Sequence, residues 1–309
     1  MTLRVLYRSY AGMNTKERPS WFTKKLALLS MLRAVEEAGA EILFLNDGPL
    51  DDDLDALMRS YGEVITLPGV GMRASYLEAL QLPIRRGWPS EDIVYFAEDD
   101  YLHAPDALVR LAEAADALPA DYYALYGSDP ALGIWHDTNV ERHESVVPRG
   151  WAPPAPVMLK GLRWVGIPAT ASTFAVRVRV LPEDWRISWL AGLGHRKMYR
   201  DRDICLTVQG YPSHPWPRLA RDLVLISSGS FLWRARGAFL VPFKAAMNLR
   251  GHRRPARRRV LMCALPNLAT HLETAYLTPD RDWDQLALDT AAWTPTGAGR
   301  LGVRGADDS

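Results

Sequence analysis

The chain has 309 residues, 48% of them hydrophobic, which is enough for one large core or two modest ones and excludes disorder over most of its length. Lysine and arginine total 37 against 36 for aspartate and glutamate, which excludes a uniformly basic or acidic protein and makes any electrostatic specialisation local. Two cysteines, Cys205 and Cys263, are too few for a disulfide framework or a thiolate zinc site, which favours a reducing compartment.

The N-terminus runs directly into a strand-like pattern. Residues 1–7 lack the longer apolar stretch of a signal peptide. The most apolar later stretch, Ala238 to Phe243, is short, contains Pro242 and is flanked by arginines, so it is not expected to span a bilayer. These features predict a cytoplasmic protein without a transmembrane segment.

The first half of the chain shows the alternation of strands and helices that builds a parallel sheet. Short apolar runs predict strands at residues 3–7, 41–45, 63–67 and 92–96. Amphipathic spacing predicts one helix capped by Ser20 and ended by Gly39, a second over about residues 73–82, and a third that Pro105 opens. We therefore predict an α/β fold with a mainly parallel sheet and helices on both faces, whose ligands bind at the carboxyl ends of the strands.

The second half is less regular. Strands are predicted at residues 122–126 and 172–178, and the long Trp- and Pro-rich stretches between them are typical of loops that carry binding specificity. Toward the C-terminus the apolar content becomes too low for packing. The predicted organisation is a single domain over residues 1–285, with an insertion at about 212–260, and a C-terminal tail over 286–309.

Three consecutive carboxylates, Glu98, Asp99 and Asp100, follow the fourth predicted strand. Carboxylates this close are costly to place together, because like charges raise one another's pKa. Mg²⁺ or Mn²⁺ removes that cost, since such ions prefer oxygen ligands and are held by one or two carboxylates together with substrate phosphates. Glu98 and Asp100 point to the same side if the strand continues. The alternative is a solvated acidic loop.

Residues 94–103, V-Y-F-A-E-D-D-Y-L-H, resemble the D-x-D motif and its flanks in glycosyltransferases of the GT-A type. The resemblance spans residues 3–285 apart from about 212–260. It implies a GT-A (Rossmann-like) fold with acceptor-side insertions in the C-terminal half. It also implies a metal-dependent enzyme that takes Mn²⁺ or Mg²⁺ and transfers a sugar from a nucleotide-sugar donor, with a UDP-sugar favoured over a GDP-sugar, to an acceptor hydroxyl.

The resemblance also assigns residues to the donor site. Asp47, after the second strand, corresponds to the acid that often contacts the nucleotide base, and Arg8 lies nearby after the first strand. Arg73 belongs to a segment, G-M-R-A, that occupies the place of a Gly- and Arg-containing loop approaching the nucleotide. Glu98 and Asp99 are expected to orient the ribose and the metal ligands.

A downstream acidic motif resembles the part of the family that supplies the catalytic base. Residues 201–206, D-R-D-I-C-L, are followed by Gly-Tyr, and in inverting members the acid aligned with Asp201 deprotonates the acceptor hydroxyl. Arg200 stands where an acidic residue is common, which leaves the choice between Asp201 and Asp203 open. Asp201 is also a candidate helix cap, and the two roles are compatible.

Residues 266–272, P-N-L-A-T-H-L, resemble the C-terminal segment in which GT-A enzymes supply a histidine to the metal. The metal ligands implied are therefore Asp100 and His271, with Glu98. Imidazole is a reasonable ligand beside carboxylate and phosphate oxygens. A lone histidine is more often structural, and that alternative stays open.

A basic segment lies in the stretch that the resemblance does not cover. Residues 232–249 have apolar side chains at helical spacing, and six arginines crowd the segment that follows: Arg250, Arg253, Arg254, Arg257, Arg258 and Arg259. Three interpretations remain: a solvated basic face, attachment to an anionic membrane surface by an enzyme that glycosylates lipid-linked saccharides, or contact with DNA phosphates.

A looser similarity bears on the acceptor. N-T-K-E-R-P at 14–19, the E-D-D-Y core, A-T-H-L at 269–272 and T-P at 278–279 are similar to segments of glycosyltransferases associated with DNA base modification, which act mainly in phage systems. The acceptor implied is a 5-hydroxymethylpyrimidine in DNA, in a host cytoplasm if the gene belongs to a phage. The alternatives are an enzyme of surface polysaccharide or lipid-linked glycan synthesis and a non-catalytic DNA- or membrane-binding module. A sugar-1-phosphate nucleotidyltransferase is disfavoured, because Y-R-S-Y-A-G at 7–12 is a poor phosphate loop.

Overall fold

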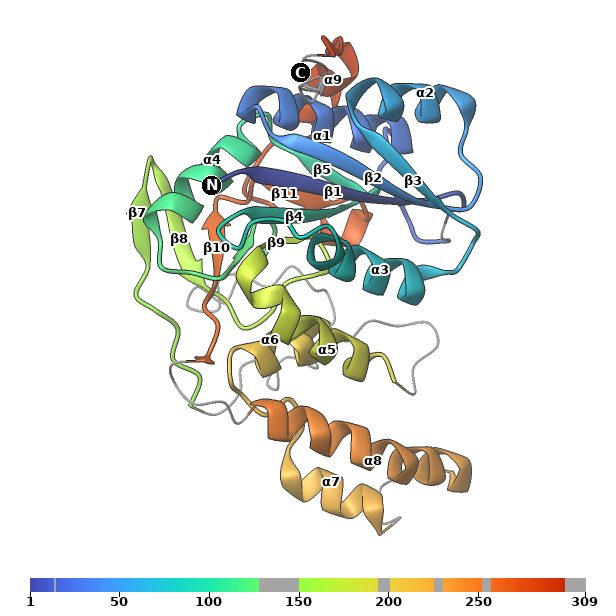
Figure 1. Ribbon diagram of the computed structural model, residues 1–309, viewed down its shortest axis with the longest axis vertical. Helices are drawn as coiled ribbons and strands as arrows, with labels where there is room; N and C mark the ends of the chain where they lie inside the picture. Colours follow the sequence, from blue (N-terminus) through green and yellow to red (C-terminus); the bar gives the residue numbers. More distant parts are fainter. Residues whose placement is uncertain (14, 128–149, 194–200, 225–229, 252–256, 298–309) are drawn as a thin grey trace, which may run out of the picture.

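The computed structural model describes residues 1–297 except 14, 128–149, 194–200, 225–229 and 252–256. Within this part of the chain, nine strands form one sheet in the order β3-β2-β1-β4-β9-β6-β10-β8-β7 (Figure 1). The strands are β1 (Leu3–Tyr10), β2 (Glu41–Asp47), β3 (Glu63–Leu67), β4 (Ile93–Glu98), β6 (Tyr122–Ala124), β7 (Val157–Leu159), β8 (Leu162–Gly166), β9 (Phe174–Arg177) and β10 (Leu261–Leu265).

Most of the sheet runs in one direction. β3, β2, β1 and β4 pair in parallel, as do β6 and β10. β9 is antiparallel to both of its neighbours, and β8 is antiparallel to both β10 and β7. Only β9 and β8 therefore oppose the other strands of this sheet in the described residues, which confirms the predicted α/β class and its mainly parallel sheet.

Helices cover both faces of the sheet, as predicted. They are α1 (Lys24–Ala38), α2 (Asp52–Tyr61), α3 (Met72–Arg85), α4 (Ala107–Ala117), α5 (Leu181–Ala191), α6 (Asp201–Val208), α7 (Trp216–Leu223), α8 (Phe231–Gly251) and α9 (Trp283–Ala292). Because side chains alternate along a strand, Val5 and Tyr7 join a core layer with Leu32 of α1, whereas Leu6 joins the opposite layer with Leu80 of α3. The first layer also takes in α2 and α4, and the second takes in α5 and α6.

The structure moves two predicted boundaries. The cap of α1 is Thr23, whose hydroxyl accepts a hydrogen bond from the Leu26 amide at 2.9 Å, and not Ser20. The predicted end at Gly39 is confirmed, with a left-handed φ of 59°. The tail predicted from residue 286 contains most of α9, because Ala287 is buried with residues of α1 in a third core cluster, so helix continues to residue 292.

A separate two-stranded sheet links two distant segments. β5 (Tyr101–His103) continues the chain just after β4, and it pairs antiparallel with β11 (Ala269–His271). In this register His271 lies opposite Tyr101, and the Leu272 amide donates to the Asp100 carbonyl at 2.8 Å. The pairing therefore brings the P-N-L-A-T-H-L segment to the acidic cluster.

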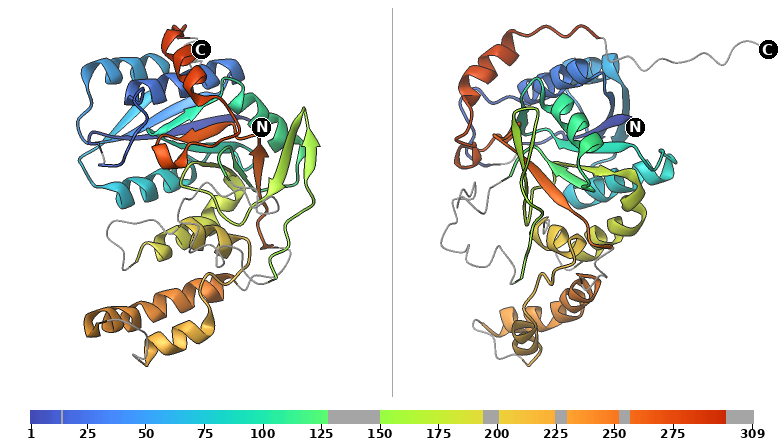
Figure 2. Two further views of the ribbon diagram at one scale, coloured as in Figure 1. Left: turned by 180° about the vertical axis from the view of Figure 1, so that it is seen from behind. Right: turned by 90° about the vertical axis from the view of Figure 1, so that its left-hand side faces the viewer.

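The basic insertion folds as a helical hairpin of α7 and α8, at the opposite end of the long axis from α9 (Figures 1 and 2). The Lys244 ammonium of α8 lies 3.3 Å from the Asp222 carboxylate of α7. Asn248 of α8 accepts from the His214 amide at 3.0 Å and donates to its carbonyl at 2.6 Å. The first contact joins the two helices, and the contacts of Asn248 anchor α8 to the loop before α7. No helix of the described residues is long and apolar enough to cross a membrane.

Candidate active site

The order of the strands reverses between β1 and β4. From β1 the chain adds β2 and β3 on one side, and it then returns to place β4 on the other. In open α/β sheets, ligands bind outside the carboxyl ends of the strands at such a switch point. Arg8 and Glu98 are register partners at these ends, and Asp99 and Asp100 follow β4 directly.

Glu98 and Asp99 each lie beside a cation. The Arg8 guanidinium donates to the Glu98 carboxylate and, at 3.2 Å, to the Ser75 hydroxyl. Asp99 accepts from the Lys24 ammonium at 2.8 Å and from the Tyr10 amide at 3.1 Å. Burial raises the pKa of Glu98 and of Asp99, and the positive charges of Arg8 and Lys24 offset part of that rise.

Asp100 lies between two positive partners. Its Oδ2 is 3.1 Å from an Arg18 guanidinium nitrogen and 3.2 Å from Nε2 of His271. Burial by itself would raise the pKa of Asp100, but its contacts with His271 and Arg18 hold the pKa below its usual range. Asp100 is thus an ionised carboxylate at neutral pH, directly beside the histidine that the sequence predicted as its partner.

Glu273 completes a possible metal site that the sequence only partly predicted. Its Oε1 lies 3.4 Å from Nδ1 of His271, and single ligand atoms of Asp100, His271 and Glu273 all lie within 4.8 Å of one another. Two carboxylates and an imidazole suit Mn²⁺ or Mg²⁺. Glu98, which was predicted as a ligand, lies outside this group and pairs with Arg8. Glu273 could have been predicted as a metal ligand from its position two residues after His271, because alternate residues of an extended segment point the same way.

Three tyrosines surround the His271 ring. Its centroid is 4.9 Å from that of Tyr101, 5.8 Å from that of Tyr276 and 6.5 Å from that of Tyr126. The first two rings meet the imidazole edge to face, an arrangement that favours one ring orientation. These contacts fix the direction in which the histidine nitrogens point.

The segment that leads into α1 supplies further cations to the site. Lys16 pairs with Glu273, and Arg18 donates to the Leu272 carbonyl at 2.6 Å in addition to its contact with Asp100. Together with Lys24, these side chains place a positive charge beside each of three carboxylates. Lys16 and Arg18 belong to the N-T-K-E-R-P motif, but no local pattern in the sequence assigns them to these carboxylates.

Asp201 begins the described part of α6 and faces the carboxylate cluster. Burial raises its pKa to about 7, with a further rise from the negative charge of Glu98 and an opposing effect of Arg8. Asp201 lines a cavity of about 20 Å³, which has room for one water-sized molecule, together with Tyr76, Thr170 and other side chains. A carboxylate with such a pKa can accept a proton near neutral pH.

Asp203 lies elsewhere, although only two positions separate it from Asp201. Its Oδ2 is 3.6 Å from Nε2 of His214, and it lines a cavity together with Lys244 and Met247 of α8. Two positions turn an α-helix by about 200°, so the two carboxylates leave α6 on opposite sides. Asp201 is therefore the one that shares an environment with Glu98 and Arg8.

The remaining predicted donor-site residues lie at the same edge of the sheet. Asp47 is buried, and its two carboxylate oxygens accept the amides of Val70 and Gly71 at 2.7 Å each, so it holds the loop between β3 and α3. Arg73 lies against Gly192, where a Cβ would stand 2.7 Å from its Nε. The predicted nucleotide contacts of both residues stay predictions.

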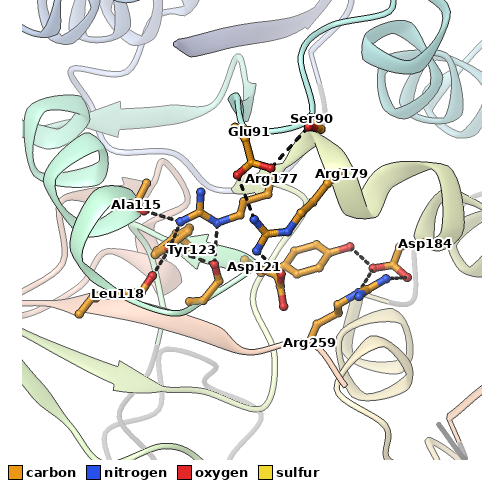
Figure 3. Close-up of polar contacts among 12 residues, drawn as sticks. Ser90, Glu91, Ala115, Leu118, Asp121, Tyr123, Arg177, Arg179, Asp184 and Arg259 are labelled. Carbon is orange, nitrogen blue, oxygen red and sulfur yellow. Dashed lines mark hydrogen bonds and ion pairs between the residues drawn. The ribbon is translucent and has the colours of Figure 1, made fainter. Parts of the chain in front are cut away.

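The six predicted basic residues do not form one surface. Arg259 is bound to Asp184 at 2.9 Å (Figure 3). It also pairs with Glu183 at 2.6 Å, and the Tyr122 hydroxyl donates to Asp184 at 3.0 Å. Arg259 is thus part of a buried structural network. Arg250, Arg257 and Arg258 are exposed, and Arg253 and Arg254 lie outside the described residues.

No protein-family model matches the chain, and a search of curated protein sequences finds no match. Among solved structures, the chain is similar to TarS of S. aureus. Residues 1–349 of that protein match at 12% identity and a TM-score of 0.38, over 67% of this chain and 54% of that one. The same fragment in complex with UDP-GlcNAc matches at 13% identity and a TM-score of 0.38, over 67% and 52%.

A CMP:2-keto-3-deoxy-manno-octonic acid synthetase complexed with CTP matches at 14% identity and a TM-score of 0.35, over 60% of this chain and 78% of that one. The chain spans about half the length of the TarS fragment. The function of this chain has therefore to be inferred from its own residues.

Proposed function

We propose that the chain is a metal-dependent glycosyltransferase, which moves a sugar from a nucleotide-sugar donor to an acceptor hydroxyl. The convergence of Asp100, His271 and Glu273 at the switch point, with Asp201 facing the same cluster, supports this proposal. The resemblance to GT-A glycosyltransferases, which placed Asp100, His271 and Asp201 in these roles, points the same way.

The donor set fits a divalent cation that prefers oxygen and nitrogen ligands, either Mn²⁺ or Mg²⁺. Asp100, His271 and Glu273 would hold it. When bound, the cation would stabilise the negative charge of the departing nucleoside diphosphate. Glu98 and Asp99 would orient the nucleotide, and a UDP-sugar is the favoured donor.

The cations that pair with these carboxylates gain a second role in this scheme. Lys16 and Arg18 neutralise Glu273 and Asp100. With a divalent cation held by Asp100 and Glu273, Lys16 and Arg18 would be able to donate to phosphate oxygens of the donor instead. Arg8, one strand away, would add to the positive field around the diphosphate.

Asp201 is the proposed general base. It takes the proton from the acceptor hydroxyl while the acceptor oxygen forms a bond to the anomeric carbon, and the bond from that carbon to the diphosphate oxygen breaks. This direct displacement inverts the anomeric configuration. Asp203, the other acid of the motif, is held beside His214 and serves as the matched control.

Two acceptor classes are compatible with this chemistry. The motif similarity to DNA-modifying glycosyltransferases supports a 5-hydroxymethylpyrimidine in DNA. The exposed apolar side chains of the α7–α8 hairpin favour the second class, a lipid-linked or surface glycan, because aliphatic side chains match a membrane surface better than a phosphate backbone.

The test is incubation with a panel of nucleotide sugars and Mn²⁺, first without an acceptor and then with DNA that contains 5-hydroxymethylpyrimidines or with a lipid-linked glycan. Mass analysis identifies the products. We expect metal-dependent release of a nucleoside diphosphate and sugar on one acceptor. Unchanged turnover in Asp100→Ala would overturn the site assignment, and a product of retained configuration would remove Asp201 from the role of base. Release of pyrophosphate would indicate a nucleotidyltransferase instead.

A further inference from the structure

The charge of the chain is divided unequally. Residues 212–260 contain eleven lysines and arginines and one acidic residue, Asp222, whereas the rest of the chain has 26 basic and 35 acidic residues. The nearly neutral chain therefore combines a segment of net charge +10 with a remainder of net charge −9. Asp222 is buried beside Lys244, and the charges of these two residues offset each other.

The same hairpin exposes large apolar side chains. Six of them, at 58% to 79% exposure, are Leu223, Val224, Phe231, Leu232, Phe239 and Leu249, and we call this group the hairpin surface. On the other side of α8, Leu240, Val241 and Met247 are buried, and α8 contacts α5 and α6 there. The helix is thus apolar on the side that faces solvent as well as on the side that faces the protein. Exposed apolar clusters of this kind mark interaction sites.

Exposed arginines accompany the hairpin surface. Arg218 and Arg221 lie on α7, and Arg236 and Arg250 lie on α8. Aromatic and aliphatic side chains among arginines are the composition of helices that lie in a membrane interface. The apolar groups enter the boundary between headgroups and acyl chains, while the guanidinium groups remain with the lipid phosphates.

We propose that the α7–α8 hairpin docks the protein on the surface of an anionic lipid membrane. The proposal does not depend on the proposed catalysis. It orients the molecule, because the strongly negative remainder is repelled by anionic lipid while the hairpin, at one end of the long axis, is attracted (Figures 1 and 2). A membrane-bound acceptor would then be presented to an enzyme held at the same surface.

Two other occupants fit the surface less well. A second copy of the chain would bring two segments of net charge +10 together, and their repulsion opposes a symmetric contact. Nucleic acid would satisfy the arginines, but it offers phosphates and base faces to a surface that contains Leu223, Val224, Leu232 and Leu249. Lipid satisfies both the charge and the aliphatic side chains.

The test is co-sedimentation of the full chain with vesicles of phosphatidylcholine, with and without phosphatidylglycerol. We expect binding to the anionic vesicles and at least about tenfold less binding to the neutral ones. The variant Phe231→Ser/Leu232→Ser/Phe239→Ser should reduce partitioning by about tenfold or more, because it removes apolar surface that inserts. The matched control is Leu288→Ser on α9, which is 64% exposed, like Phe239, and should leave partitioning unchanged.

Circular dichroism shows whether each variant is folded, and Arg236→Glu/Arg250→Glu provides an independent variant that should also lose binding. The absence of partitioning of the folded chain into anionic vesicles would overturn the proposal. The proposal would also be overturned, in favour of DNA, if the triple variant still bound duplex DNA and vesicles did not compete for that binding. It would be overturned in favour of a second copy of the chain if the protein self-associated in a concentration-dependent way and the triple variant did not. None of these binding measurements needs a sugar donor, a metal ion or turnover. A failure of the docking proposal is therefore distinguishable from a failure of the proposed transferase activity.

Discussion

The acidic cluster at the ends of β1 and β4 and the α7–α8 hairpin use charge in opposite ways. In the cluster, Glu98, Asp99 and Asp100 are largely buried, and each lies beside a cation from another part of the chain. In the hairpin, arginines and large apolar side chains share the solvent-exposed surface. A buried charge is stable only when it is paired, whereas an exposed arginine remains hydrated. The cluster therefore keeps its charges paired inside the fold, whereas the hairpin presents its charges to solvent.

The largest expected effect is a loss of catalysis that leaves membrane binding by the hairpin unchanged. Asp100→Ala and His271→Ala each remove a proposed metal ligand, so we expect kcat/KM for sugar transfer to fall by about 10³-fold. Partitioning into anionic vesicles should not change, because the hairpin is untouched. Turnover assays and co-sedimentation on the same preparations check both outcomes. A joint loss of catalysis and vesicle binding in a folded variant would contradict the separation.

The raised pKa of the buried Asp201 carboxyl should be visible in the pH dependence of kcat. We expect kcat of the wild type to rise with pH through about 7, because Asp201 must be ionised to act as a base and burial raises its pKa to that value. Asp201→Asn should lower kcat by roughly 10²-fold and remove this rise. Asp203→Asn, on the other side of α6, should keep the pH dependence.

The same substitution has a predicted effect on stability. The folded-state pKa of Asp201 lies above that of an exposed aspartate, so its contribution to stability is present at low pH and is lost as pH rises through about 7. Asp201→Asn should therefore raise the free energy of unfolding by roughly 1 to 3 kcal/mol at about pH 8 and not at about pH 4. Urea unfolding at the two pH values measures the difference. An equal effect at both would refute the assigned cause.

The basic segment contains a paired, largely buried arginine, Arg259, next to an exposed one, Arg258, and substituting each in turn compares their contributions to stability. Arg259→Ala removes the guanidinium that lies beside the Asp184 carboxylate, which is 2% exposed, and should lower the free energy of unfolding by about 3 kcal/mol. Arg258→Ala removes an exposed side chain that stacks on Tyr211 and should cost less than about 1 kcal/mol. Chemical denaturation of the pair measures this contrast. Equal losses would mean that the segment behaves as one surface.

The smallest expected effect distinguishes two carboxylates of the site. Glu273→Gln should weaken Mn²⁺ binding by about tenfold, because Glu273 lies in the group with Asp100 and His271. Glu98→Gln should weaken it by less than about threefold, since Glu98 pairs with Arg8 and contributes through the field of the site alone. Titration calorimetry with Mn²⁺ compares the two. The reverse order would support Glu98, rather than Glu273, as the third ligand.

The sequence by itself determined what depends on near neighbours. Short apolar runs predicted the first four strands of the sheet, and amphipathic spacing predicted α1 and α3 but not α2. The abrupt run of carboxylates after β4 marked the candidate site. The motif resemblance then singled out Asp100, Asp201 and His271, which the structure places around one cluster. These features were visible because strand, cap and turn preferences act over a few residues.

The tertiary structure decided which distant residues meet. Antiparallel pairing of β5 with β11 brings His271 and Glu273 to Asp100, and no local pattern specifies that register. β7, β8 and β10 were not predicted, since short strands late in a chain owe their conformation to the sheet they join.

The same holds for α8. Its apolar residues predicted a helix, but only packing against α5 and α6 decided that Met247 is buried while Phe239 and Leu249 face solvent. The physical reason is the same in each case. Burial and pairing between segments far apart in the chain depend on how the whole chain returns on itself, and propensities of neighbouring residues do not encode that path.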